Sequence, residues 1–297
     1  MHVITDKQCL NYSQKGHPER PQRIAATLEF LRAQKEIKII WDKPTIAKES
    51  LIEKAHILEH IHLVENPIDA FDADTPNYPD IDAHARRSVG GALRALELAR
   101  KNKPNFSLLR PPGHHATKKK AMGFCFFNSI AITALAARSA GVKKVAVFDF
   151  DVHHGNGTQE IFYNNSNVLY ISTHQYPFYP GTGSSNEKGS SNNILNIPLD
   201  SGTGSDIYLN SFEYALKKLK NFKPEFILLS SGFDAHAKDP LAQINLKSKD
   251  FYEITKRILN IANDICDGKV VSILEGGYNL DALRESAFEH VRALIEN

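Results

Sequence analysis

Apolar residues along this chain fall into short runs and into longer stretches with helical spacing. Short runs rich in β-branched residues predict buried strands at 3–5, 38–41, 106–109, 144–148, 168–172, 226–230 and 270–274. Apolar residues spaced three and four apart predict amphipathic helices at 20–33, 83–101, 128–140, 206–219, 249–266 and 280–295. Strands that alternate with helices indicate an α/β fold, with a mostly parallel central sheet and helices on both faces. We find no linker, and we therefore expect one domain spanning residues 1–297.

Two segments depart from this alternation. Residues 66–82 are rich in Asp, Asn and Pro, and residues 175–205 are rich in Gly, Ser and Asn. Long irregular segments within a compact domain are usually functional or mobile, although solvated surface connections are the simpler alternative. We expect both segments to form loops.

Chemically suggestive motifs follow several of the predicted strands directly. They are RPPGHH at 110–115, DFDVHHGNG at 149–157, STHQYPFYPGTG at 172–183, SGFDAH at 231–236 and EGGYNL at 275–280. Ligands of open parallel α/β sheets bind outside the carboxyl ends of the strands. The sequence therefore predicts a single active site at this rim.

The motif DFDVHHGNG and Asp234 offer ligands for a metal ion. Alternate side chains of an extended segment share one face, which directs Asp149, Asp151 and His153 to the same side. Asp151, His153 and Asp234 would supply two oxygens and one nitrogen and leave a position open, as in catalytic zinc sites. The ordinary alternatives are an Asp234 that only caps the next segment and a histidine that is a satisfied core or surface residue.

The adjacent His114 and His115 and the glycine-flanked Tyr278 are candidates for catalysis. Histidine titrates near neutral pH, and we expect His115 to act as general base and acid with His114 as its electrostatic partner. Tyr278 follows Gly276 and Gly277, and glycine permits backbone conformations closed to other residues, so the loop can approach the site closely. The Tyr278 hydroxyl is suited to stabilising an oxyanion. Packing alone is the alternative role for this tyrosine.

Composition indicates which partners and which cellular environment to expect for this protein. The 36 Lys and Arg residues nearly balance 34 Asp and Glu residues, which disfavours direct binding of nucleic acid. Cys9, Cys125 and Cys266 are widely spaced and indicate neither a disulfide framework nor a thiolate zinc site. The N-terminus lacks the pattern of a signal peptide, and no apolar stretch approaches the roughly 20 residues that span a bilayer. We expect a cytoplasmic protein with no membrane partner.

Together with GFCFFN at 123–128 and HPERPQR at 17–23, these motifs resemble the zinc-dependent histone deacetylase family. The class II and bacterial deacetylase-like branch, within the acetylpolyamine amidohydrolase superfamily, is the most similar. The resemblance implies an arginase/deacetylase-like fold, one Zn²⁺ per subunit and hydrolysis of the N-acetyl or other N-acyl amide of lysine to a free amine. It marks Asp151, His153 and Asp234 as zinc ligands, His114 and His115 as the histidine pair and Tyr278 as the oxyanion donor.

The same resemblance assigns supporting roles around the reacting groups. It places Asp149 behind His114, and it places Asn156 behind His115 where some relatives have an aspartate, so that His115 should be less basic. The wall of an acyl-lysine tunnel would comprise Gly123, Phe124 and Tyr179, where phenylalanine is more usual than Tyr179. Relatives also bind K⁺ beneath the zinc, and the corresponding residues here are Asp149, Asp151, His153, Ser172 and Thr173, largely through backbone oxygens.

Two further positions bear on the substrate. Asp74 is the nearest candidate for the acidic residue with which many relatives hold the substrate backbone. Leu241 lies where a polyamine-specialised relative has glutamate, and an apolar residue there does not favour a cationic polyamine. An acetylated lysine of a protein or peptide is therefore the expected substrate, with an acetylpolyamine or another small acetylated amine as the alternative.

Two other classes of function compete with this hypothesis. One is a non-catalytic binder of acyl-lysine, which the complete set of candidate ligands, base and tyrosine disfavours. The other is a ureohydrolase with two manganese ions, for which the segment DAHAKD offers only His236 and Asp239 at awkward spacing.

Overall fold

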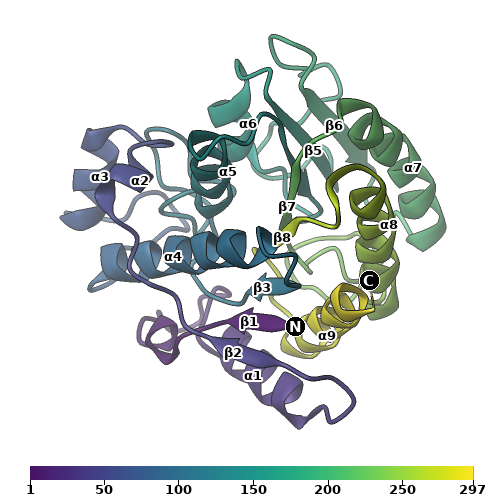
Figure 1. Cartoon of the computed structure of the whole chain (residues 1–297). Coiled ribbons are helices and arrows are strands. Elements are labelled where there is room, and N and C mark those ends of the chain that lie inside the picture. The colour runs from purple at the N-terminus through teal and green to yellow at the C-terminus, as the bar shows by residue number, and fades with distance from the viewer. Residues whose placement is uncertain (297) are drawn as a thin grey trace.

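An eight-stranded sheet in which all neighbouring strands are parallel forms the centre of this computed structural model, which describes residues 1–296 (Figure 1). From one edge to the other, the strands are β2 (Ile40–Asp42), β1 (His2–Ile4), β3 (Asn105–Ser107), β8 (Val270–Leu274), β7 (Phe226–Ser231), β4 (Val145–Asp149), β5 (Val168–Gln175) and β6 (Ile194–Leu199).

The helices pack in two groups. One comprises α1 (Gln22–Ala33), α9 (Leu280–Ile295), α8 (Ser248–Cys266) and α7 (Ser205–Phe222), and the other comprises α4 (Ile81–Ala99), α5 (Ser129–Ser139), α6 (Asn156–Phe162), α2 (Glu49–Ile52) and α3 (Leu58–Glu65). Strand β7 contacts α5 from one group and α8 from the other, so the groups cover opposite faces of the sheet (Figure 1). The predicted α/β fold is confirmed.

The central strands are uniformly buried. Every residue of β4, β5 and β7 is buried, as expected for parallel strands covered on both faces. Their continuous apolar runs explain why the sequence predicts these strands closely. Because parallel strands end at the same edge, the loops after β3, β4, β5, β7 and β8 meet there.

Sequence reasoning missed one strand and three short helices. The segment 175–205 contains strand β6, which pairs with β5 from Tyr170 opposite Ile194 to Gln175 opposite Leu199. This edge strand contains Pro198 and is only partly buried, so its apolar pattern is weak. Helices α6, α2 and α3 were also missed because each is short. The segment 66–82, in contrast, contains no helix or strand before α4 begins at Ile81.

The structure also shows the state of the three cysteines and the character of the helices. Cys9, Cys125 and Cys266 are buried and unpaired. None of the helices within residues 1–296 combines the length and the apolar character needed to cross a bilayer.

Candidate active site

Asp151, His153 and Asp234 converge at the carboxyl ends of β4 and β7. The Nδ1 atom of His153 lies 3.3 Å from Oδ1 of Asp151 and 3.2 Å from Oδ2 of Asp234. One candidate ligand atom from each residue lies within 4.8 Å of the other two, and all three residues are buried. Strand β4 ends at Asp149, so the turn after the strand, and not the pleat of the strand itself, directs Asp151 and His153 to this point.

This donor set fits a divalent cation. The remaining oxygens are oriented by the backbone: Asp151 Oδ2 accepts a hydrogen bond from Gly276 N at 2.7 Å, and Asp234 Oδ1 accepts one from Val152 N at 2.9 Å. Burial would lower the pKa of His153, but Asp151 and Asp234 raise it to about 10, which shows that the carboxylates favour positive charge here. Two carboxylates and one imidazole are ligands that Zn²⁺ accepts, with a fourth position left open.

Asp234 does not cap a helix, which corrects the alternative role considered for it. Its carboxylate accepts the backbone N–H of Val152, which belongs to the loop after β4. The side chain therefore joins two strand-end loops and faces the metal-ligand group.

Each residue of the histidine pair has a different partner. Nδ1 of His114 lies 3.1 Å from Oδ2 of the buried Asp149, and Nδ1 of His115 lies 2.8 Å from Oδ1 of Asn156. The two imidazole rings are 4.0 Å apart between centroids. The hydrogen bonds expected from the family resemblance are thus present in the structure.

These partners separate the proton affinities of the two imidazoles. Burial lowers the pKa of His115, the neighbouring His114 lowers it further, and the neutral Asn156 supplies no compensating charge. Burial would also lower the pKa of His114, but Asp151 and Asp149 raise it to about 10. One imidazole therefore carries a positive charge while the other is neutral and free to accept a proton.

Tyr278 reaches the same point from the loop after β8. Gly277 before it has φ +119°, a conformation that favours glycine, and Tyr278 itself is 7% exposed. The guanidinium carbon of Arg23 lies 4.8 Å from the centroid of the Tyr278 ring, and Nε of Arg23 donates to Gly277 O at 2.6 Å. Sequence reasoning missed this role of Arg23, although the residue closes the motif HPERPQR.

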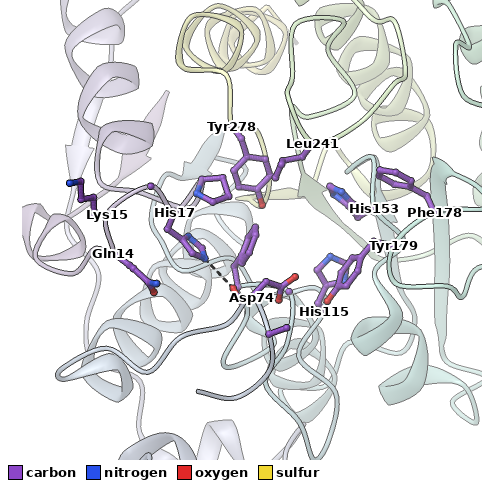
Figure 2. Close-up of a pocket in the computed structure, with 15 residues that line it drawn as sticks. Gln14, Lys15, His17, Asp74, His115, His153, Phe178, Tyr179, Leu241 and Tyr278 are labelled. Atoms are coloured by element: carbon purple, nitrogen blue, oxygen red, sulfur yellow. Dashed lines mark hydrogen bonds between the residues drawn. The ribbon is translucent and has the colours of Figure 1, made fainter. Parts of the chain in front are cut away.

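A cavity of about 570 Å³ leads from the surface to these groups. Its wall includes the predicted substrate-binding residues Gly123, Phe124, Tyr179, Leu241 and Asp74, together with His115, His153, Tyr278, Phe178 and His17. Figure 2 shows the Tyr278 ring facing the cavity, with Leu241 beside it and with His115 and Tyr179 on the other side.

Phe178 and His17 are cavity residues that sequence reasoning left without a role. The Phe178 ring stacks on the His153 ring, with centroids 5.5 Å apart and planes at 18°. Nε2 of His17 lies 3.0 Å from the carbonyl oxygen of Asp74, the contact drawn as a dashed line in Figure 2. Phe178 lies within STHQYPFYPGTG and His17 within HPERPQR. Membership of these motifs was the only signal in the sequence that could have indicated a place at the site.

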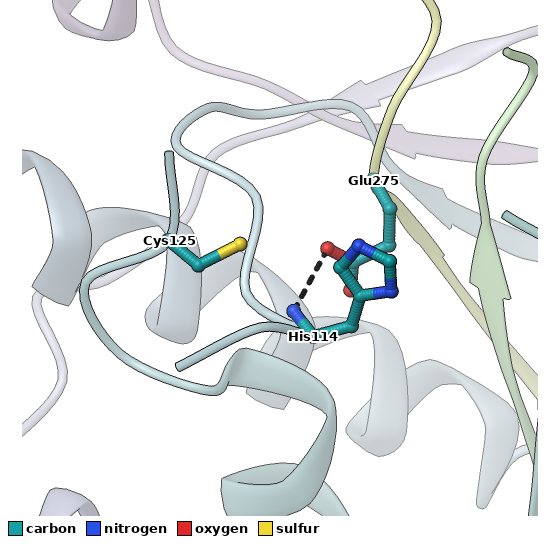
Figure 3. A group of neighbouring side chains, drawn as sticks. All are labelled: His114, Cys125 and Glu275. Atoms are coloured by element: carbon teal, nitrogen blue, oxygen red, sulfur yellow. Dashed lines mark hydrogen bonds between the residues drawn. The ribbon is translucent and has the colours of Figure 1, made fainter. Parts of the chain in front are cut away.

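A second buried group of possible metal ligands lies beside the first (Figure 3). It comprises His114, Cys125 and Glu275. Oε2 of Glu275 accepts the backbone N–H groups of Gly113 at 2.6 Å and of His114 at 3.1 Å. Burial raises the pKa of the Cys125 thiol well above its ordinary value, which disfavours the thiolate that a metal would need. We interpret Glu275 as the support that holds the RPPGHH turn in place.

Ser172 and Thr173, two of the residues named for K⁺, lie on β5 beside β4, the strand that ends at Asp149. Ser172 of β5 is the register partner of Asp149 in β4. The hydroxyl groups of Ser172 and Thr173 are engaged by His174 Nδ1 at 2.8 Å and by the Tyr208 hydroxyl at 2.6 Å. A potassium ion would therefore depend on backbone oxygens, and this site stays a prediction.

The geometry also disfavours a second, manganese-type metal site after Asp234. His236 and Asp239 do not join the metal-ligand group of the described residues. His236 Nδ1 accepts the backbone N–H of Lys238 at 3.1 Å, and Asp239 Oδ2 accepts the backbone N–H groups of Tyr278 and Asn279.

The sequence and the structure of this chain are similar to those of known deacetylases. The model of the histone deacetylase domain family matches residues 17–294. A probable deacetylase of Archaeoglobus fulgidus is 36% identical over 294 residues, covering 94% of this chain and 81% of that protein. A histone deacetylase-like amidohydrolase of Pseudomonas aeruginosa is 38% identical over 277 residues, covering 89% of this chain and 73% of that protein. The crystal structure of the HDA15 HD domain superposes with a TM-score of 0.93 at 36% identity, covering 100% of this chain and 91% of that one.

Proposed function

The chain belongs to the histone deacetylase family, and we propose that it is a zinc-dependent deacetylase that hydrolyses the N-acetyl amide of lysine side chains. The observation that carries this proposal is one cavity wall that contains the imidazole of His115, whose pKa lies well below its ordinary value, the hydroxyl-bearing Tyr278, and His153 from the group of three convergent candidate metal ligands. A non-catalytic binder of acyl-lysine would need none of these groups in this arrangement.

The chain's own residues divide the reaction between them. A zinc ion held by Asp151, His153 and Asp234 would polarise the amide carbonyl and lower the pKa of a water molecule. His115 takes the proton from the attacking water and later gives it to the leaving amine, for which its neutral state is required. The positively charged His114 adds a favourable field for the developing negative charge, and the Tyr278 hydroxyl donates to the same oxyanion.

The wall of the cavity supports lysine as the source of the amine. Phe124 and Tyr179 present aromatic surface to a methylene chain, and Leu241 offers no charge to a cationic polyamine. Asp74 lies at the cavity with its side chain partly buried, where it could accept backbone N–H groups of a peptide. An acetylpolyamine is the second candidate substrate, because the aromatic wall accepts any methylene chain.

A comparison of two substrates on one preparation tests the proposal. We would measure kcat/KM for an acetyl-lysine peptide and for an N-acetylated polyamine, with and without a chelator, and after adding Zn²⁺ back. Turnover of the peptide that a chelator abolishes and zinc restores is the expected result. Preference for the polyamine would favour the second candidate, and no turnover of either would contradict the proposal.

A further inference from the structure

The carboxylate of Asp239 joins the loop that carries Tyr278 to the loop that carries Leu241. Oδ2 of Asp239 accepts the backbone N–H of Tyr278 at 2.7 Å and that of Asn279 at 3.2 Å. Oδ1 accepts the backbone N–H of Leu241 at 3.0 Å. Asp239 is only 7% exposed, so these hydrogen bonds form largely out of contact with water.

These bonds supply acceptors for backbone N–H groups just before helix α9. The loop after β8 must stop extending and begin α9 at Leu280, and the N–H groups at a helix start have no partners within the helix. The side chain of Asn279 accepts Ala282 N at 3.0 Å, while the N–H groups of Tyr278 and Asn279 themselves depend on Asp239. Without Asp239, the peptide planes on either side of Tyr278 would lose their acceptor.

Arg23 fixes the backbone on the N-terminal side of Tyr278. Nε of Arg23 donates to Gly277 O, the carbonyl of the peptide bond that leads into Tyr278, at 2.6 Å. Its Nη2 donates to Glu275 O at 2.5 Å. The peptide between Gly277 and Tyr278 is thus held at its oxygen by Arg23 and at its N–H by Asp239.

We propose that Asp239 is a positioning residue for Tyr278, which sets the place of the tyrosine hydroxyl through the backbone without touching the substrate. The inference rests on the proposed function, because it assumes that this hydroxyl stabilises the oxyanion. Catalytic hydrogen bonds are sensitive to displacement, and an error of about 1 Å can reduce the rate about 100-fold. A carboxylate that accepts three N–H groups is suited to preventing such a displacement.

A double-mutant cycle tests this role. Asp239→Asn keeps the shape of the side chain but turns an amide NH₂ toward one group of donors. We expect kcat to fall about 10- to 100-fold in the wild-type background and by less than about 3-fold in a Tyr278→Phe background, because the hydroxyl to be positioned is already missing. Any change in KM that follows from the bond to Leu241 should be equal in both backgrounds.

Asp281→Asn is the matched control. Asp281 is an exposed carboxylate in the first turn of α9, paired with Arg284 and without a contact to the peptide of Tyr278, and its substitution should leave kcat unchanged. Bound zinc and the melting temperature are measured for every variant, and turnover is compared at equal zinc content. Should Asp239→Asn fail to fold, Asp239→Glu enters the same cycle, because it keeps both acceptor oxygens but displaces them by one methylene.

The outcomes separate this inference from the proposed function. Equal losses of kcat in both backgrounds, or no loss in either, would overturn the positioning role while leaving the deacetylase proposal intact. A wild-type enzyme without chelator-sensitive turnover would contradict the proposed function, and this inference with it.

Discussion

His115 donates from Nδ1 to the amide oxygen of Asn156, 2.8 Å away, and this neutral partner distinguishes it from His114, which faces a carboxylate. The hydrogen bond to Asn156 raises the pKa of His115, but without the charge of a carboxylate it does not outweigh the lowering by burial and by His114. The pair therefore contains one imidazole that is charged and one that is available as a base at neutral pH.

Asn156→Asp should move the pH dependence of activity. A carboxylate at this position would favour protonated His115 and raise its pKa, because an opposite charge stabilises the imidazolium. Since the base works in its neutral form, the acidic limb of the kcat/KM profile should shift to higher pH. Asn156→Ala should reduce activity without this upward shift. A profile that coincides with that of the wild type would contradict the role of Asn156.

Tyr278→Phe should reduce kcat about 100- to 1,000-fold with little change in KM, because one oxyanion donor is lost while the ring is kept. Steady-state kinetics at saturating zinc measure the effect. The ring contact with Arg23 is preserved, so the melting temperature should change little. Full activity of this variant with bound zinc would rule out the proposed donor.

Asp234→Asn should abolish stoichiometric zinc binding. It removes one of the three ligands, and the loss of affinity should exceed the roughly 10- to 100-fold effect of losing a residue that only orients a ligand. Metal content by mass spectrometry after dialysis is the measurement. His154→Gln is the control, because the buried His154 contacts Thr182 and Gln159 and is not in the metal-ligand group. Retention of zinc by Asp234→Asn would contradict the assignment.

Glu19→Gln should destabilise the protein by about 3–5 kcal/mol, because it leaves the buried Arg110 without a countercharge. Oε2 of Glu19 lies 2.6 Å from Nη2 of Arg110, and the two side chains are 2% and 0% exposed. Urea unfolding measures the change in the free energy of unfolding. Glu97→Gln, which breaks the exposed pair with Arg94, should cost less than about 0.5 kcal/mol. Equal effects of the two substitutions would contradict this prediction.

The buried His290 should make stability depend on pH. Its Nδ1 lies 2.6 Å from the Thr255 hydroxyl, which itself donates to Phe251 O, so Nδ1 must be the donor and Nε2 accepts from Ser272. Burial lowers the pKa of His290 to about 3, compared with about 6.5 in the unfolded chain. As the pH falls, the unfolded chain binds this proton before the folded protein does. The contribution of neutral His290 to the free energy of unfolding is therefore complete above pH 6.5 and is lost as the pH falls toward 3.

Urea unfolding at pH 7 and pH 5 measures this dependence. His290 should account for up to about 2 kcal/mol of the loss between these two pH values, at about 1.4 kcal/mol per pH unit. His290→Gln should reduce the difference in the free energy of unfolding by this amount. An unchanged difference would show that His290 does not remain neutral in the folded protein.

The sequence determined the fold class and singled out the candidate reacting groups. Buried strands such as β4 have continuous apolar runs, because both faces of a parallel sheet are covered by helices and both must be apolar. The motifs after these strands named Asp151, His153, Asp234, His115 and Tyr278, because parallel topology alone brings strand ends to one edge. Strand β6 escaped prediction because an edge strand needs no continuous apolar pattern.

Only the tertiary structure decided how these groups are supported. Glu275 under the histidine turn, Arg23 at the carbonyl of Gly277 and Asp239 at the N–H of Tyr278 act on residues far from them in the chain. Each contact joins a side chain to the backbone of another loop, and backbone groups are the same in every residue type. The sequence therefore carries no local signal for such bonds, and they become visible only when folding brings the loops together.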